Sequence, residues 1–410
     1  MKYRISFLLV CVASCLSFSA SVSAFINHVD SYDTSVTTNR IKDISETNAL
    51  AEDIWNRLTS EFVTQYEAGN IAQAASVAKT AYELAENSFG PNDVNTADSL
   101  LKLGIVNESL GNYGKAKEYM VGALVILKEE MGPYHEDVAV IYTNLANLYF
   151  EQNLLEESED YHQQALSIRR RNLGDNDPSV AQSLYNLAVL YDETENYKKA
   201  QPYYEQALKI WYGSYGPNHP YVANTLNNLA NVYSSLGDME SALEMHKHSL
   251  KIRRQIYGDV HAETARSLIN LGKLYVKMSR YDDAAPVYAE AIKVAEHLFG
   301  PSHPQVAMLL YSLANVYHIE GRMSADKAGA QKAALTTSNS RSQELYAKAL
   351  PLYERALNIM DNTIGSDHPA VMAMMNEMSM LYKSVGNQAK MTKMMARINE
   401  QKHDAETHHP

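Results

Sequence analysis

Asparagine recurs at fixed spacings along this chain, and its amide group can both donate and accept hydrogen bonds. Asn224, Asn227, Asn228 and Asn231 are spaced i, i+3, i+4 and i+7, which places four amides on one helical face. The equivalent positions form two columns, Asn144, Asn186, Asn228 and Asn270 in one and Asn147, Asn231 and Asn315 in the other. A row of amides can pair with the backbone of an extended peptide whatever side chains that peptide carries.

Two interpretations of these asparagines stay open. The column that contains Asn144 either faces a ligand or bridges neighbouring repeats and stabilises their packing. For Asn224, Asn227 and Asn231 we favour exposure to a ligand. Each hydrogen bond to a peptide would contribute about 0.5–1.5 kcal/mol, so several are needed, on a surface that is already rigid.

Charged residues give this face a polarity. Arg266, Lys273 and Lys277 add positive charge to a later stretch, whereas Asp192 and Glu193 add negative charge to an earlier one. A peptide with a carboxylate toward the later stretch would fit this arrangement. The alternative is an ordinary solvated charged face.

Five histidines share a column and raise the question of a metal site: His135, His219, His261, His303 and His368. Equivalent neighbouring helices lie about 8–10 Å apart, whereas each ligating ring nitrogen must lie about 2 Å from the ion. We therefore predict that these histidines cap helix N-termini, as Asp177 would before Pro178, and we predict no metal.

Other chemistry is hard to find in the sequence. There is no Gly-rich phosphate loop, His-Glu-x-x-His or Gly-x-Ser-x-Gly motif. The two cysteines, Cys11 and Cys15, precede the folded body, so thiolate zinc sites and cysteine nucleophiles are excluded there. The net charge of −12 argues against nucleic acid as the partner. We predict a protein that is not an enzyme, with no catalytic residues and no cofactor.

A 42-residue period positions all of these residues. Gly90, Gly132, Gly174, Gly216, Gly258 and Gly300 are each 42 residues apart, and Gly365 follows 65 residues later. The extra 23 residues indicate an insertion within 322–345, which we predict to be a mobile excursion broken at Thr336 to Ser342.

Each period holds two helices. Val222, Leu226, Leu229 and Tyr233 form one apolar helical stripe, and a second helix extends from about Glu240 to Tyr257 before Gly258. One such pair cannot bury its apolar face alone, so stacked pairs must share a continuous core. We predict an all-α solenoid over residues 51–400 with seven to eight helix pairs, which start near residues 51, 93, 135, 177, 219, 261, 303 and 369. The methionine-rich last pair would be a cap in which methionine fills the core rather than binding copper.

The two ends of the chain predict its location. Lys2 and Arg4 precede a short apolar run, and small residues end at Ala24, which is typical of a secretory signal peptide over residues 1–24. Alternatively, Val12 to Cys15 resembles a bacterial lipobox, and Cys15 would carry a lipid anchor. Residues 25–50 are predicted to be a flexible leader, and residues 401–410 a disordered tail. We expect an exported bacterial protein, periplasmic or secreted.

These repeats resemble tetratricopeptide repeats, specifically the 42-residue type of kinesin light chains. The resemblance rests on Leu226 to Tyr233, on Ala200 to Ile210 and on the Gly-Pro-Asn-His-Pro link at 216–220, and it covers about residues 51–400. It implies a right-handed superhelix whose first helices line a concave groove that binds peptides or partner proteins. We therefore expect an exported scaffold for protein–protein interaction; the alternative is an assembly protein that oligomerises through its convex face or repeat edges.

Overall fold

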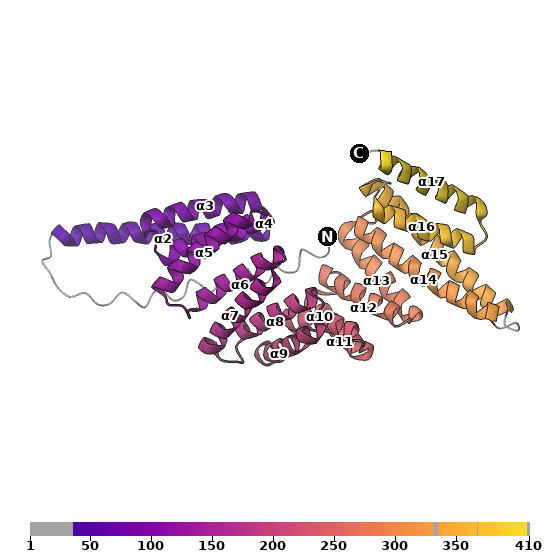
Figure 1. Cartoon of the computed structure of the whole chain (residues 1–410), viewed down its shortest axis with the longest axis horizontal. Coiled ribbons are helices and arrows are strands. Elements are labelled where there is room, and N and C mark those ends of the chain that lie inside the picture. Colours follow the sequence, from indigo (N-terminus) through magenta and orange to yellow (C-terminus); the bar gives the residue numbers. More distant parts are fainter. Residues whose placement is uncertain (1–35, 331–334, 367, 408–410) are drawn as a thin grey trace. The chain divides into compact units, whose positions relative to one another are not determined.

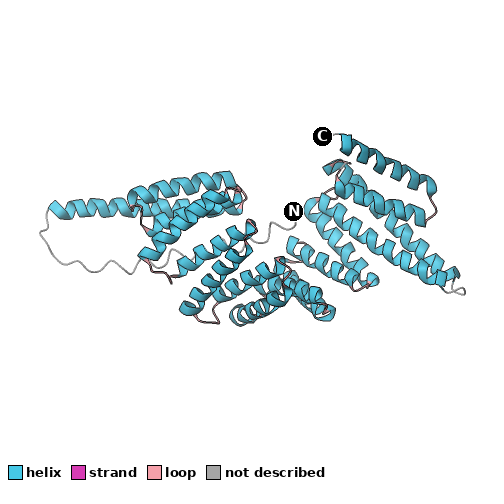
Figure 2. Cartoon of the chain, in the orientation of Figure 1, coloured by secondary structure: helices cyan, strands magenta, loops and turns pink. Residues whose placement is uncertain are grey.

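Helices alone build the part of the chain that the structure describes. The computed structural model describes residues 36–330, 335–366 and 368–407, and within these ranges every regular element is an α-helix (Figure 2). The predicted all-α fold is confirmed, and consecutive helices pair as the 42-residue period requires.

The helices, which are labelled along the chain in Figure 1, belong to two compact units, and the boundary between Ile210 and Trp211 falls inside α9. The first unit holds four helix pairs: α2 (Val36–Glu67) with α3 (Ile71–Ser88), α4 (Val94–Ser109) with α5 (Tyr113–Glu130), α6 (Glu136–Glu151) with α7 (Leu155–Leu173), and α8 (Pro178–Glu193) with α9 (Tyr197–Tyr215). The second unit holds four more: α10 (Pro220–Leu236) with α11 (Met239–Tyr257), α12 (Ala262–Lys277) with α13 (Tyr281–Phe299), α14 (Pro304–Ala330) with α15 (Leu335–Ile364), and α16 (Pro369–Ser384) with α17 (Gln388–Thr407).

Histidine caps start the first helix of most pairs, as the sequence predicts. In each case the ring Nδ1 accepts a hydrogen bond from the backbone N–H two residues later, at 3.1–3.3 Å, for His135, His219, His261, His303 and His368. Asp93 and Asp177 do the same with a carboxylate oxygen. The column therefore satisfies backbone donors that a helix N-terminus would otherwise leave without a partner.

Replacement of a histidine cap should have a modest, specific cost. We expect His261→Ala to lower the free energy of unfolding by about 1 kcal/mol, because the backbone N–H of Glu263 loses its acceptor. His261→Asp should retain most of the stability, since aspartate already fills this position at Asp93 and Asp177. Urea unfolding at pH 7.5 measures both; equal losses in the two variants would contradict the capping role.

The turns inside seven of the pairs, all but that of α14 and α15, contain a residue with positive φ. Glycine supplies it at Gly69, Gly111, Gly237 and Gly386, but Asn153, Glu195 and Ser279 adopt φ of 58–60° at the equivalent position. A side chain with a Cβ pays about 1–2 kcal/mol for this conformation.

We expect Glu195→Gly to raise the free energy of unfolding by about 1 kcal/mol, because glycine adopts a φ of 58° without the clash at Cβ. Glu195→Ala should bring no such gain, since alanine keeps the Cβ. Thermal melting of the two variants tests the prediction, and it is wrong if alanine stabilises as much as glycine.

The core of the second unit is continuous from one repeat to the next. In the second unit, one cluster of buried side chains extends from Ala230 on α10 to Ile398 on α17, as expected for stacked pairs. Met374, Met375 and Met378 lie in this cluster at 0–1% exposure. These three methionines fill the core as predicted.

The last helix departs from the pattern of the others. Leu250, Ile292 and Leu357 are buried at one position of successive second helices, where α17 has Asn399. Ile252, Val294 and Ile359 are buried at another, where α17 has Gln401. These amides replace the apolar residues that would pack against a further pair, so α17 ends the stack as a cap.

Three segments differ from the sequence prediction. The leader predicted over 25–50 is helical from Val36, because α2 begins there. Residues 336–342, predicted to break the helical pattern, lie in the first part of α15, so the insertion lengthens α14 and α15. The tail predicted over 401–410 continues α17 to Thr407. The signal peptide of residues 1–24 and Cys15 lie outside the described residues.

Candidate functional site

The candidate site is a face of the second unit formed by the first helices of three pairs. We define this first-helix face by four equivalent positions on each helix: Asn224, Asn228, Asn231 and Ser235 on α10, Arg266, Asn270, Lys273 and Lys277 on α12, and Met308, Ser312, Asn315 and Ile319 on α14. Each helix thus contributes residues spaced i, i+4, i+7 and i+11, which share one side of a helix. The chemistry changes from amides on α10 to cations on α12 and exposed apolar ends on α14.

An arginine from a second helix joins α10 to α12 at one edge of this face. Arg253 of α11 is 1% exposed, and its guanidinium donates to Asn224 Oδ1 at 2.7 Å and to Ser267 Oγ at 2.6 Å. Its Nε lies 3.2 Å from Glu263 Oε2. Arg266 also donates to Asn224 Oδ1, at 3.3 Å, and pairs with Glu263. The Asn224 carbonyl oxygen is therefore already engaged by two arginines.

A second set of contacts bridges the same two helices. Asn270 Nδ2 donates to Asn227 Oδ1 at 2.9 Å, and Asn227 Nδ2 donates to Asn228 Oδ1 at 3.3 Å. The expected exposure of Asn227 is wrong: its side chain is 4% exposed, because its amide spans the space between two repeats. Lys277 Nζ donates to the carbonyl oxygen and hydroxyl of Ser234, at 2.7 and 3.0 Å.

The exposed part of the face lies beside these bridges. Asn231 and Lys273 occupy equivalent positions on α10 and α12, and both are exposed. Asn315, the third member of that column, instead accepts a hydrogen bond from the Tyr353 hydroxyl and faces the second helix of its own pair. Met308 and Ile319 on α14 are 46% and 37% exposed. A ligand on this face would meet an amide, a cation and two apolar side chains.

The predicted asparagines of the first unit are buried. Asn144 donates to the Val140 carbonyl of its own helix at 2.9 Å, and Asn186 accepts from Gln182 at 2.8 Å. Asn147 is also buried, at 9% exposure. The bonds of Asn144 and Asn186 stay within their own helices, whereas Asn270 of the same column bridges to Asn227 in the preceding repeat.

Carboxylates gather at the ends of first helices in the first unit. Burial, with the charge of Glu151 as a smaller cause, raises the pKa of Glu108 on α4 to about 8. Burial, followed by the charge of Glu193, raises the pKa of Asp192 on α8 to about 7. Both carboxylates lie near helix C-termini, where negative charge is disfavoured. These raised pKa values reduce the negative charge at this end of the first helices near neutral pH, in contrast to the cations of α12.

Sequence reasoning missed the buried arginines that organise these faces. Arg169 on α7 is 2% exposed; it bonds Glu136 of α6 at 2.8 Å and Ser183 of α8 at 2.7 Å, as Arg253 bonds its own neighbours. Arg169 and Arg253 are 84 residues apart, and so are Ser183 and Ser267. This shared spacing of two repeats was the feature of the sequence that could have identified both arginine–serine pairs.

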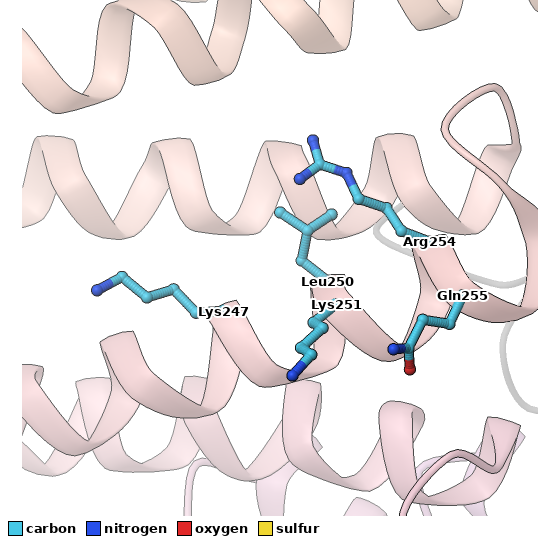
Figure 3. Close-up of a pocket in the computed structure, with 5 residues that line it drawn as sticks. All are labelled: Lys247, Leu250, Lys251, Arg254 and Gln255. Atoms are coloured by element: carbon cyan, nitrogen blue, oxygen red, sulfur yellow. The ribbon is translucent and has the colours of Figure 1, made fainter.

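A hollow of about 360 Å³ lies on α11, away from the first-helix face. It is lined by Lys247, Leu250, Lys251, Arg254 and Gln255, and Arg254 and Lys251 extend to opposite sides of the helix (Figure 3). Glu244 and Asp259 pair with Lys247 and Arg254 at 3.0 and 3.2 Å. The lining side chains do not converge on one point, so we assign no ligand to this hollow.

Solved structures with similar folds include three repeat proteins. BtubC (BKLC) from P. vanneervenii is 25% identical, with a TM-score of 0.50 over 56% of this chain and 91% of that one. The tetratricopeptide repeat sensor protein PH0952 from Pyrococcus horikoshii, a signal transduction ATPase, is 16% identical, with a TM-score of 0.61 over 86% of this chain and 47% of that one. A putative kinesin light chain from Podosopora anserina is 20% identical, with a TM-score of 0.46 over 56% and 97%. No curated protein matches the chain.

Within the described ranges, no helix is both long and apolar enough to cross a bilayer.

The family assignment rests on the repeats themselves. The family model for the tetratricopeptide repeat matches six overlapping stretches: residues 63–129, 109–170, 137–213, 200–255, 221–297 and 263–325. Together with eight helix pairs in a 42-residue register, these matches show that the chain belongs to the tetratricopeptide repeat family.

Proposed function

We propose that this protein is an exported scaffold that binds a peptide or partner protein on the first-helix face of α10, α12 and α14. Tetratricopeptide repeat proteins bind protein partners, and the family is generally non-catalytic. For this chain we therefore propose a binding role without catalysis.

The observation that carries the proposal is the bridged pair α10 and α12. Hydrogen bonds between Asn227 and Asn270, and between Asn224 and Arg266, hold the two helices in register. Exposed Asn231 and Lys273 lie beside these bonds. A surface that is already ordered loses little conformational entropy when a ligand binds, so a few hydrogen bonds can give measurable affinity.

The charges on α12 favour one polarity of ligand. Lys277 is held by oxygens of Ser234, which carry no net charge, and Lys273 is exposed one turn before it. A carboxylate of the bound peptide would be attracted to this helix. The exposed Met308 and Ile319 on α14 would then contact an apolar side chain of the same peptide.

A double variant tests the binding face without removing the bridges. Asn231→Ala with Lys273→Glu changes two exposed positions and leaves Asn224, Asn227 and Asn270 in place. The mature chain is used as bait in an extract of its own host, and the co-purifying proteins are quantified by mass spectrometry. We expect recovery of the principal partner to fall at least about tenfold, equivalent to about 1.4 kcal/mol.

The matched control makes the same change of charge elsewhere on the same unit. Lys293→Glu lies on the second helix α13 and is also exposed. This control should leave recovery unchanged. Unchanged recovery with the first-helix variant, while its helical circular dichroism is intact, would remove the assignment.

The alternative function is assembly through a repeat edge, and one observation favours it. Five large apolar side chains near the links of the second unit are 36–45% exposed: Ile256, Tyr257, Val260, Leu298 and Phe299. Exposed apolar groups of this kind often mark protein interfaces. Multi-angle light scattering separates the two functions, because a strict monomer at high concentration contradicts self-assembly.

Export is a separate part of the proposal and depends on residues 1–24. Their charged start, apolar run and small-residue end support cleavage after Ala24. The mass of the mature protein purified from its host distinguishes an N-terminus at Phe25 from a lipidated Cys15, and a full-length mass would contradict export by this route.

A further inference from the structure

One position of the second helices from α7 to α15 holds either histidine or tyrosine. Tyr204, Tyr288 and Tyr353 occupy it in α9, α13 and α15, and His162 and His246 occupy it in α7 and α11. The two histidines are 2% and 1% exposed. They are among the most buried polar side chains in the described ranges, and the proposed binding function does not use them.

His246 has an unsatisfied ring nitrogen beside a buried cation. Within the described part of the chain, Nδ1 of His246 has no hydrogen-bond partner. Arg253, whose charge acts on the ring, follows seven residues later on the same side of α11. A buried polar atom without a partner costs free energy, so the His246 ring lowers the stability of the contact between α11 and its neighbouring helices.

Arg253 also connects α11 to the first-helix face. It reaches Asn224 on α10 and both Glu263 and Ser267 on α12. Any change that displaces this guanidinium must therefore loosen the attachment of α10 to α12. His162 and Arg169 repeat the arrangement in the first unit, with Ser183 in place of Ser267.

Charged groups of the helices around α11 that form ion pairs do so with partners other than His246. On α12, Glu263 is shared by Arg253 and Arg266. On α13, Glu290 pairs with Arg254. On α9, the Tyr212 hydroxyl lies 3.5 Å from Nδ1 of His248, a different ring. Lys277 of α12 donates a hydrogen bond to the Ser234 carbonyl oxygen of α10. No carboxylate in the described part of the chain forms an ion pair with His246.

We propose that His246 and Arg253 form an acid-sensitive latch that holds α10, α11 and α12 together only while the His246 ring is neutral. Protonation places an imidazolium and a guanidinium in one buried interface, with no carboxylate to compensate the new charge. The interface relieves this by opening, and the contacts of Arg253 across α10 and α12 are lost. The inference does not depend on the proposed binding function, although the latch borders the same face.

The direction of the pH effect follows from burial. Burial, with the charge of Arg253 as a smaller cause, lowers the pKa of His246 from 6.5 to about 4. A histidine with a lowered pKa takes up its proton more readily in the open state. The closed state is therefore favoured above pH 6.5, and this advantage is lost as the pH falls below it. Between pH 7.5 and 5.5, the opening constant should rise about tenfold.

Hydrogen exchange of the whole chain, resolved to peptides by mass spectrometry, tests the latch. Opening constants are compared at pH 7.5 and 5.5 after correction for the intrinsic exchange rate. We expect the amides of α11, and those of α10 and α12 that it holds, to open about tenfold more at pH 5.5. An unchanged opening constant in α11, or a rise confined to α11, would overturn the proposal.

A tyrosine variant supplies the matched control. His246→Tyr places tyrosine in the register of Tyr204 and Tyr353, and the matching first-helix positions, Ala230, Ala188 and Ala314, are all fully buried alanines. Because tyrosine stays neutral in this range, the opening constant of α11 should change less than about twofold between the two pH values. His246→Gln serves if the tyrosine variant does not fold. Both variants keep the capping histidines, so a persistent tenfold rise in either would assign the effect to those caps and overturn the latch.

Discussion

Arg253→Ala is expected to lower the free energy of unfolding of the second unit by about 3–5 kcal/mol, because it removes a fully buried side chain together with its bonds to α10 and α12 and leaves buried Ser267 without its donor. Arg253 is 1% exposed and bonds Asn224, Ser267 and Glu263, so its removal also leaves a cavity between three helices. Urea unfolding followed by circular dichroism, with hydrogen exchange to localise the change, measures the loss. Stacked repeats need not unfold in one step.

Arg253→Met separates the polar contacts from simple filling of space. Methionine occupies the equivalent position at Met360, where it is 4% exposed, so its volume suits this layer of the core. Glu263 would keep its pairing with Arg266. We expect this variant to cost no more than about 2 kcal/mol. If methionine costs as much as alanine, the stabilisation comes from the hydrogen bonds and not from packing.

Glu108→Gln is expected to stabilise the first unit strongly in mild alkali. Burial raises the pKa of Glu108 to about 8 in the folded chain, whereas an exposed glutamate titrates near 4.5. A carboxyl group with a raised pKa contributes stability that is present below pH 4.5 and is lost as the pH rises through 8. Each pH unit in this window costs about 1.4 kcal/mol, so glutamine should gain up to about 4 kcal/mol at pH 9.

The measurement is a series of melting curves from pH 5 to pH 9. The wild-type melting temperature should fall over this range, and the fall should be smaller in Glu108→Gln. Glu118→Gln on α5 changes the same functional group at an exposed position and should leave the curve unchanged. Parallel curves for all three proteins would show that Glu108 ionises like an exposed residue.

The regular part of the fold could be predicted because its determinants are local. Gly258 ends α11 with a φ of 85°, and His219 and Asp177 begin the next helices through bonds to their own backbone. These effects involve residues a few positions apart, so one sequence shows them. Departures occurred where the pattern was weakest: α2 begins at Val36, in a stretch that lacks a clear apolar period.

The candidate site was harder to predict because its contacts cross repeats. Asn227 has the spacing of an exposed amide, but Asn270 of the next repeat turns it into a buried bridge. Arg253 follows Leu250 and Ile252 on a helix with a polar outer side, and only the packed structure shows that it reaches α10 and α12. A period identifies equivalent positions, but it does not tell which of them hold one another and which face a ligand.

The amides that end α17 also limit how molecules can join. Were a second molecule to add its first pair against this helix, Asn399 and Gln401 would lie in a layer that is apolar between all the preceding pairs. An amide enclosed without hydrogen bonds costs free energy, so burial of the exposed Asn399 disfavours this junction. Head-to-tail addition would otherwise have no natural limit, and this amide opposes growth into filaments through α17.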